Sequence, residues 1–248
     1  MAFKDLFSKH AKQYTQYRPR YPRELFEFLA TLPGRRESAW DCGTGNGQAA
    51  VDLAEFFGEV IATDPSAEQI AHAQRNAKVN YLVCSAEECP LAGGSVDLVT
   101  VAQALHWFDR DQFFRQVRRV GGAGSVLAVW SYGLAHVTSA VDRVVWHLYS
   151  DLLGPYWPPE RKRIEERYDT ILFPFDELPT PRIAMTAQWN LPDLIGYLGT
   201  WSSVQRFIDS RGTNPIQEVQ AELAKAWGVA DAFHEVSWPL YLRVGRIA

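Results

Sequence analysis

Short apolar runs alternate with amphipathic segments through the first half of the chain. The apolar runs predict five strands, at residues 38–42, 59–63, 79–84, 95–102 and 125–130. Segments with apolar residues at helical spacing predict helices at residues 23–31, 46–57, 66–76 and 110–120. The run at 95–102 is apolar almost throughout, which is typical of a strand buried on both faces. Strands and helices that alternate in this way predict βαβ units around a parallel sheet.

The second half of the chain interrupts this alternation near residue 132 and resumes it near residue 182. The interruption predicts two helices, at 137–153 and 160–169, on either side of a proline-rich aromatic loop. The resumed pattern predicts strands at 182–189 and 233–243 and helices at 191–208 and 216–227. We expect both late strands to rejoin the sheet.

These elements predict an α/β fold: a doubly wound, mostly parallel, seven-stranded, Rossmann-like sheet with a helical cap insertion. Residues 1–132 and 182–248 would form the core, and residues 1–22 would be an N-terminal lid. Residues 133–181 would form the cap, with a contribution from the helix at 191–208.

Composition argues for a globular chain and against a nucleic-acid partner. Of the 248 residues, 47% are apolar and 22% are charged, which suits a sizeable core and argues against disorder. The formal net charge is −4, whereas nucleic-acid binders usually carry a basic excess or stripe. Two dense basic stretches, Arg118-Arg119 and Arg161-Lys162-Arg163, are interpreted as solvated helix faces.

The remaining compositional signals concern compartment and metals. The N-terminus is polar, and the chain has no run of about 18 apolar residues, so neither a signal peptide nor a membrane span is predicted. The three cysteines form no disulfide framework, and Cys84 and Cys89 lack the paired spacing of zinc ligands. We therefore expect a cytoplasmic protein with no metal site and no membrane partner.

The strongest local motif is Asp41-Cys42-Gly43-Thr44-Gly45-Asn46-Gly47, which joins a predicted strand to a predicted helix. Glycines at this point allow the backbone to turn sharply and to approach a ligand closely. Asp64 ends the next strand, where a carboxylate can accept hydrogen bonds from two ribose hydroxyls. The two features together predict an adenosine-containing ligand.

The spacing of the motif separates the two main ligands of this kind. Dinucleotide binders use G-x-G-x-x-G, but here Gln48 stands at the third glycine position of that pattern. Asp41 would repel a pyrophosphate and suits an ammonium group. The motif therefore favours S-adenosylmethionine over NAD, and a nicotinamide-dependent oxidoreductase is the weaker alternative.

On these residues the chain resembles the class I S-adenosylmethionine-dependent methyltransferases from about residue 37 to 130. Further motifs are similar to those of the trans-aconitate methyltransferase-like group and extend the resemblance over most of the chain. They are Tyr14-x-x-x-Arg18-Pro19-x-Tyr21-Pro22, His106-Trp107-Phe108-Asp109, Leu153-Gly154-Pro155-Tyr156-Trp157 and Thr200-Trp201-Ser202.

The resemblance implies roles for individual residues around the cofactor. Asp41 would help to hold the methionine amino group, Asp64 the ribose, and Pro65 would pack on the adenine. Many members carry an aspartate where Ser85 or Ala86 stands here, which makes the adenine edge a departure from the family pattern. The full set of implied cofactor contacts is Asp41, Gly43, Gly45, Asp64, Pro65, Ala86, Glu87, Gln103, Tyr14 and Arg18.

The resemblance also implies an acceptor site. Its candidate contacts are Tyr17, Tyr21, Trp107, Tyr156, Trp157, Thr200 and Trp201, each of which could instead serve packing alone. Arg18 suits a carboxylate because its guanidinium group is planar and bidentate. His106 is the first candidate for a general base and Glu87 the second, although a carboxylate acceptor needs no base.

The predicted function is methyl transfer from S-adenosylmethionine to a small molecule, with a carboxylic acid as one candidate acceptor. A non-catalytic S-adenosylmethionine-binding regulatory protein, or a methyltransferase that acts on a protein or nucleic acid, remains an alternative. We expect a monomer or a homodimer.

Overall fold

The computed structural model describes residues 17–247 of the chain. Parallel strands form most of the sheet: β1 (Ser38–Cys42), β2 (Glu59–Asp64), β3 (Val79–Val83), β4 (Val96–Ala102) and β5 (Gly121–Tyr132). Along the sheet the order is β3-β2-β1-β4-β5-β8-β6. The two antiparallel members are β8 (His234–Arg246) and the short β6 (Asp176–Glu177). The predicted mostly parallel α/β fold is therefore confirmed.

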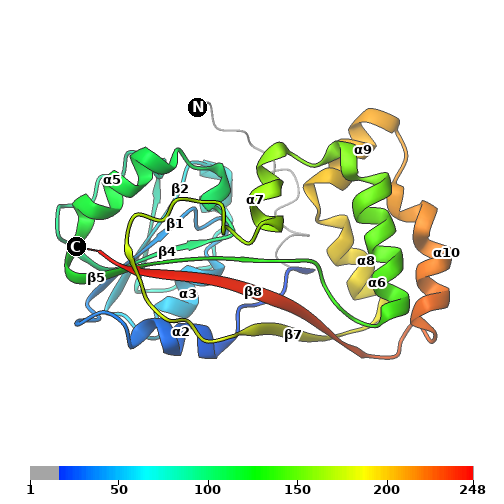
Figure 1. Ribbon diagram of the computed structural model, residues 1–248, viewed down its shortest axis with the longest axis horizontal. Helices are drawn as coiled ribbons and strands as arrows, with labels where there is room; N and C mark the ends of the chain where they lie inside the picture. Colours follow the sequence, from blue (N-terminus) through cyan, green and yellow to red (C-terminus); the bar gives the residue numbers. More distant parts are fainter. Residues whose placement is uncertain (1–16, 248) are drawn as a thin grey trace.

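Helices cover both faces of this sheet (Figure 1). On one face, α2 (Arg23–Ala30) and α3 (Gln48–Leu53) bury their apolar sides against β1 and β5. On the other face, α5 (Arg110–Val120) buries Phe113 and Val117 against Trp40 and β4. The helix α4 (Ala67–Ala71) follows β2 and begins at a Ser66 cap whose hydroxyl accepts the Gln69 amide.

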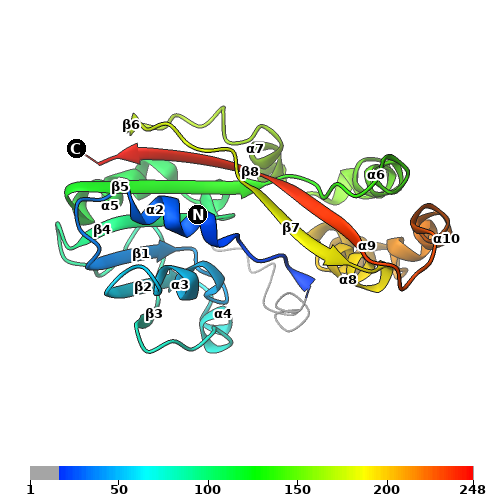
Figure 2. The same ribbon diagram turned by 90° about the horizontal axis from the view of Figure 1, so that it is seen from below.

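A group of helices lies beside one end of the sheet (Figures 1 and 2). It contains α6 (Ser139–Trp146) with its π-helical continuation (His147–Leu152), α8 (Leu191–Gly199), α9 (Ser202–Arg211) and α10 (Pro215–Trp227). The strand β7 (Ala184–Trp189) leads into this group and pairs with the first half of β8. The second half of β8 pairs with β5, so a single strand joins the sheet to the helical group. We call these helices the cap.

The helices predicted at 46–57 and 66–76 are shorter in the structure, and three other predicted elements differ from it. The late strand at 182–189 joins the sheet through β8 alone, because β7 pairs with the half of β8 that extends beyond β5. The predicted helix 191–208 is divided into α8 and α9 at Trp201, whose backbone is extended and whose ring is buried. The predicted helix 160–169 shortens to a 3₁₀ turn (Pro159–Arg161) and α7 (Lys162–Glu165).

The reason for the shorter helix lies in the second and third residues beyond its end. Arg167 and Tyr168 have positive φ angles of 55° and 62°, which a right-handed helix does not allow. This turn directs the Tyr168 ring into the core beneath α5, where it is fully buried. Ile171 and Phe173 follow it into the same cluster, so this part of segment 133–181 packs on the sheet layer.

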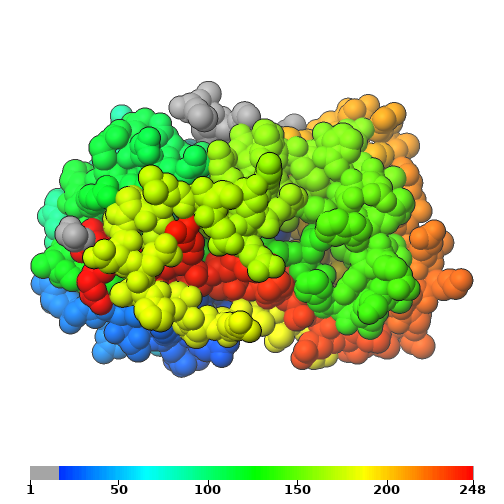
Figure 3. All heavy atoms as spheres, in the orientation of Figure 1, coloured from blue at the N-terminus to red at the C-terminus, as the bar shows by residue number. Residues whose placement is uncertain are grey.

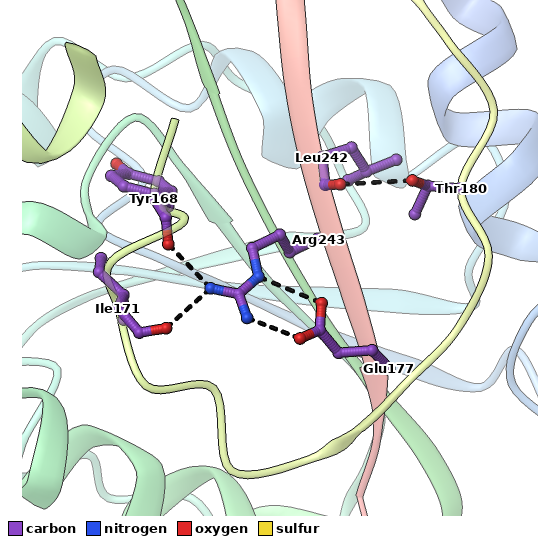
Figure 4. A network of polar contacts seen from close by, with 6 residues as sticks. All are labelled: Tyr168, Ile171, Glu177, Thr180, Leu242 and Arg243. Carbon is purple, nitrogen blue, oxygen red and sulfur yellow. Dashed lines mark hydrogen bonds and ion pairs between the residues drawn. The ribbon is translucent and has the colours of Figure 1, made fainter. Parts of the chain in front are cut away.

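Residues 168–177, which we call the returning segment, are held against β8 by Arg243 (Figure 4). One terminal nitrogen of Arg243 donates to the carbonyl oxygens of Tyr168 and Ile171, each at 2.8 Å. The other nitrogens of the guanidinium group form a bidentate pair with Glu177, at 3.2 and 2.6 Å. The group also lies 4.7 Å from the centroid of the Phe173 ring. Arg243 therefore supplies hydrogen-bond donors to two backbone carbonyls that lie outside regular secondary structure.

We predict that Arg243→Leu lowers the free energy of unfolding by about 2–3 kcal/mol, because two carbonyls and a carboxylate lose their donors. Thr180→Val is the matched control, since its hydroxyl donates to the neighbouring Leu242 carbonyl over 3.4 Å at an exposed position. It should cost under about 0.5 kcal/mol. Urea denaturation measures both values, and equal losses would contradict the role of Arg243.

Candidate active site

A cavity of about 460 Å³ lies between the carboxyl edge of the parallel strands and the cap. Crevices at this edge of an open α/β sheet are the usual ligand sites of such folds. The structure brings many of the predicted site residues to its wall: Arg18, Tyr21, Gly43, Gly45, Asp64, Pro65, Ala86, Glu87, Gln103, His106, Trp107, Trp157 and Trp201.

The loop between β1 and α3 contains three glycines, and an added side chain would meet different surroundings at each of them. Gly43, Gly45 and Gly47 have φ angles of 73°, 55° and 82°, a region that side chains disfavour. A Cβ on Gly43 would lie 2.6 Å from the Cβ of Ala104, and one on Gly47 would lie 2.1 Å from the hydroxyl of Tyr81. At Gly45 the nearest atom would be 4.0 Å away, so this residue leaves room on the cavity side.

Asp64 holds the glycine loop in place at the end of β2. One carboxylate oxygen accepts the Gly45 amide and the other accepts the Ser66 amide, both at 2.9 Å. The carboxylate thus ties the loop to the start of α4. Each carboxylate oxygen has more than one lone-pair direction, so Asp64 can bind a hydroxyl donor while it braces the loop.

Asp41 lies beneath the same loop and is not part of the cavity wall. Its side chain is buried and accepts hydrogen bonds from the hydroxyls of Thr44 and Thr100. Burial raises the pKa of Asp41 to about 6, although both hydroxyls act in the opposite direction. Above that pH a buried negative charge lies under the loop, where it favours a cationic ligand.

Gln103 at the end of β4 combines backbone strain with an unsatisfied polar atom. It has a positive φ of 55°, and its side-chain amide nitrogen makes a long hydrogen bond of 3.4 Å to the Tyr132 carbonyl. Its side-chain oxygen is buried and has no hydrogen-bond partner within the described chain. A ligand that supplies an N–H or O–H donor here would satisfy this oxygen.

His106 lies in the 3₁₀ turn Leu105–Trp107 that follows β4. Its Nδ1 is 3.0 Å from the hydroxyl of Tyr168. Burial, together with the nearby Arg161 and Arg163 cations, lowers the pKa of His106 to about 3. The ring is therefore neutral at ordinary pH and is a weak base. This environment argues against the predicted role of His106 as a general base.

The cavity wall formed by residues 157–161 and by Trp201 at the start of α9 is aromatic and cationic. The rings of Trp157 and Trp201 lie 5.6 Å apart, and the Arg161 guanidinium carbon lies 4.8 Å from the Trp157 ring. The Arg161 Nε donates to the hydroxyl of Tyr149, while the whole residue borders the cavity. This wall offers flat apolar surface and a fixed positive charge to the same ligand.

Arg18 connects the N-terminal segment to both sides of the cavity. It donates to the Tyr132 hydroxyl at the end of β5 over 2.8 Å and to the Thr200 carbonyl over 3.4 Å. Its guanidinium carbon also lies 5.6 Å from the centroid of the Tyr197 ring on α8. Arg18 therefore bridges the sheet edge and the cap.

Several predicted site residues do not reach the cavity wall. The Tyr156 hydroxyl accepts the Nε of Arg211, and the Thr200 hydroxyl donates to the Tyr197 carbonyl. Tyr17 packs against Gly196, where a Cβ would approach its ring to 2.5 Å. In the structure these three side chains make packing or surface contacts. Tyr14 lies outside the described residues.

Sequence reasoning also missed wall residues. Tyr132 ends β5 at the same sheet edge as Gln103, so extending the predicted fifth strand by two residues would have found it. Arg161 and Tyr197 gave no such signal, because their positions depend on how the cap packs. Other unpredicted wall residues include Thr44, Asn46, Gln48, Ser66, Gln69, Asp109, Gln112 and Ser202.

Residues 17–247 contain neither a metal-binding cluster nor a membrane-spanning helix. No group of three or more histidine, cysteine or acidic side chains in this part of the chain could hold a metal ion. Among the same residues, no helix has both the length and the apolar character needed to cross a bilayer.

Comparisons with known proteins identify the family of the chain. A sequence profile of the methyltransferase domain family matches residues 40–129. A candidate methyltransferase of Dictyostelium discoideum is 35% identical over 98% of this chain and 95% of its own length. The structure of a candidate type II methyltransferase from Anaeromyxobacter dehalogenans is 45% identical, covers 93% of this chain and 98% of its own, and has a TM-score of 0.88.

A more distant structure, a candidate methyltransferase of Bacillus halodurans, shares the fold at 18% identity, with a TM-score of 0.51 over 90% of this chain and 97% of its own. The chain belongs to the class I S-adenosylmethionine-dependent methyltransferases. It is therefore an enzyme of methyl transfer, with S-adenosylmethionine as its methyl donor.

We predict that Gly45→Ala and Gly47→Ala separate ligand binding from stability. Both substitutions carry the left-handed backbone cost of about 1–2 kcal/mol. Gly47→Ala should destabilise the protein further, because its Cβ meets Tyr81. Gly45→Ala should show only the backbone cost but weaken S-adenosylmethionine binding about tenfold or more, because its Cβ occupies cavity space.

Gly94→Ala is the control for strain alone, since Gly94 has a φ of 65° and a Cβ added there would have no neighbouring atom within 4 Å. Thermal unfolding and calorimetric titration with S-adenosylmethionine measure the two effects. Full cofactor affinity in Gly45→Ala would show that the ligand does not approach this residue.

Proposed function

We propose that this enzyme methylates a small organic acid and belongs to the trans-aconitate methyltransferase-like group. The observation that carries the proposal is the composition of the cavity between the glycine loop and the cap. Its wall combines the guanidinium groups of Arg18 and Arg161 with the rings of Trp107, Trp157 and Trp201. A cavity walled by the cap suits a small acceptor better than a segment of protein or nucleic acid.

The residues on the sheet side fit the proposed cofactor contacts. Asp64 would accept the ribose hydroxyls, and Pro65, with Ala86 and Glu87, would border the adenine. The unpartnered oxygen of Gln103 would accept a donor from the methionine end. The buried charge of Asp41 would favour the methionine ammonium group through the field it creates at the loop.

The protein's contribution to the reaction is orientation and the exclusion of water. When bound, S-adenosylmethionine supplies a methyl group already activated by the sulfonium charge. The cap aromatics would hold the acceptor in a dry, low-dielectric space, where alignment alone can lower a barrier by about 7–11 kcal/mol. Arg18 and Arg161 would fix the acceptor through bidentate contacts to its anionic groups.

An acid acceptor is consistent with the neutral, weakly basic ring of His106. A carboxylate is already ionised, so its methylation requires no general base. His106 would then serve as part of the cavity wall, held by Tyr168, rather than as a proton acceptor. A hydroxyl or amine acceptor would need a base that the lowered pKa of His106 does not provide.

We predict that S-adenosylmethionine affinity falls as the pH drops through about 6, the pKa of Asp41. Below this pH the carboxyl is neutral and no longer attracts a cationic ligand. Because folding raises this pKa above its ordinary value, the ionisation opposes folding, and its stability contribution declines as pH rises from 3.8 to about 6. Calorimetric titrations across this range measure the affinity.

Asp41→Asn should weaken S-adenosylmethionine binding above pH 6 and remove the dependence of that affinity on pH. Asp52→Asn is the matched control, because burial also raises the pKa of Asp52 to about 6 but this residue lies on α3, whereas Asp41 is hydrogen-bonded to Thr44 of the glycine loop. Its profile should keep the wild-type shape. A slope that disappears in Asp52→Asn and survives in Asp41→Asn would overturn the assignment.

The acceptor class is tested by a paired screen of small di- and tricarboxylic acids against their amides. We expect S-adenosylhomocysteine and a methyl ester to form with at least one acid and not with its amide. Arg161→Gln should raise the KM for that acid about tenfold or more, without changing the affinity for S-adenosylmethionine.

Lys162→Gln is the control for loss of charge, because Lys162 is exposed at the start of α7 and pairs only loosely with Glu166 at 3.7 Å. Its kinetics should match those of the wild type. Turnover of amides and acids at equal rates, or an equal effect of both substitutions, would remove the proposed role of the guanidinium groups.

A further inference from the structure

One arginine from each basic stretch of the sequence, Arg118 and Arg163, lines the same groove of the folded protein. Figure 3 shows α5, in green, beside the yellow-green segment that contains α7. Between them lies a second cavity of about 460 Å³. It is separate from the cavity between the glycine loop and the cap, which we call the methyl-transfer cavity after its proposed function. Its wall contains Arg110, Arg115 and Arg118 from α5 and Arg163 from α7, with Asp111 as its single acid.

The local structure explains this convergence. Arg110, Phe114 and Arg118 follow one another at intervals of four residues, so they lie along one side of α5. Phe114 is buried in the core below, which turns this side of the helix toward the returning segment. Arg163 faces it from α7, where the chain is held by the Arg243 contacts. The sequence interpretation of two separate solvated faces is therefore incomplete.

None of these four arginines forms an ion pair with a carboxylate in the part of the chain that the structure describes. The hydrogen bonds they donate go to neutral carbonyls: Arg118 to Pro174 at 2.9 Å and Arg163 to His106 at 3.4 Å. Elsewhere, Arg23 and Arg243 do form ion pairs. The groove thus collects positive charge on a chain whose net charge is −4.

Repulsion between Arg110 and Arg163 also indicates an excess of positive charge in the groove. Burial and the neighbouring Arg163 cation lower the pKa of Arg110, although Asp111 and Asp109 act in the opposite direction. Like charges gathered in a groove create a positive potential that attracts a multivalent anion and is relieved by one. Guanidinium groups match phosphate oxygens bidentately, and the cavity is larger than a single phosphoryl group requires.

We infer that this groove between α5 and residues 163–174 binds a small molecule that carries two or more linked phosphoryl groups. The site is distinct from the methyl-transfer cavity, so the inference does not depend on the identity of the methyl acceptor. The two sites touch through Arg163, whose side chain donates to the backbone of His106 on the wall of the first cavity.

Inorganic pyrophosphate is the probe. We expect calorimetry to show one site whose affinity falls between ionic strengths of about 0.01 M and about 0.15 M, because the contacts are exposed charges. Saturating S-adenosylmethionine should not displace it. Arg110→Gln/Arg115→Gln should raise the pyrophosphate Kd about tenfold or more while the affinity for S-adenosylmethionine, which reports an intact fold, is unchanged.

The control is Arg36→Gln/Arg182→Gln, which removes the same charge from exposed positions outside the groove. Its pyrophosphate Kd should stay within about twofold of wild type. No binding to the wild type, equal weakening in both double variants, or displacement by S-adenosylmethionine would overturn the site. Tighter binding of a thymidine oligonucleotide than of pyrophosphate would also overturn it, since the groove would then follow a nucleic-acid backbone.

Discussion

The arrangement of the whole molecule depends on the hydrogen-bond ladder of β8. Residues 240–246 of this strand pair with β5, and residues 234–239 pair with β7, which leads into the cap. Because the strand is continuous, the position of the cap is fixed by the same backbone bonds that complete the sheet. Pro239 stands where β8 changes partner and has no N–H to donate, which suits a position between two ladders. The cavity exists because this strand is long enough to carry a second layer beyond the sheet edge.

Local chemistry made part of this arrangement predictable. The strand runs, the glycine loop and Asp64 obey rules of spacing, because each is determined by its immediate neighbours in sequence or by the end of one strand. The division between α8 and α9 and the early end of α7 follow no such rule. In both places an aromatic residue, Trp201 or Tyr168, leaves helical geometry to bury its ring in a contact made with distant elements. Tertiary packing outweighs helix periodicity there, and the sequence alone does not contain the packing partner.

The sequence alone also does not predict which charged side chains lie together in the folded protein. Arg161 and Arg163 are two residues apart, yet one borders the methyl-transfer cavity and the other the groove beside α5. A basic run in the sequence suggests a single solvated face. The backbone is helical from the 3₁₀ turn into α7, so side chains two residues apart point to roughly opposite sides and reach two sites. Both arginines contribute to the lowered pKa of His106, so the protonation of this ring is disfavoured by cations at both cavities. His106 is therefore better suited to a structural position between the two sites than to proton transfer.

The methyl-transfer cavity gathers features that are unfavourable in the free chain. Gln103 holds a left-handed backbone with an unpartnered side-chain oxygen, Asp41 is a buried acid with a raised pKa, and the glycine loop uses three positive φ angles. Strain of this kind persists only where surrounding structure enforces it. A ligand that brings a donor to Gln103 and positive charge to the loop would relieve two of these costs at once. Binding and folding are then linked, so the cofactor should stabilise the protein by more than its contacts with an unstrained surface would provide.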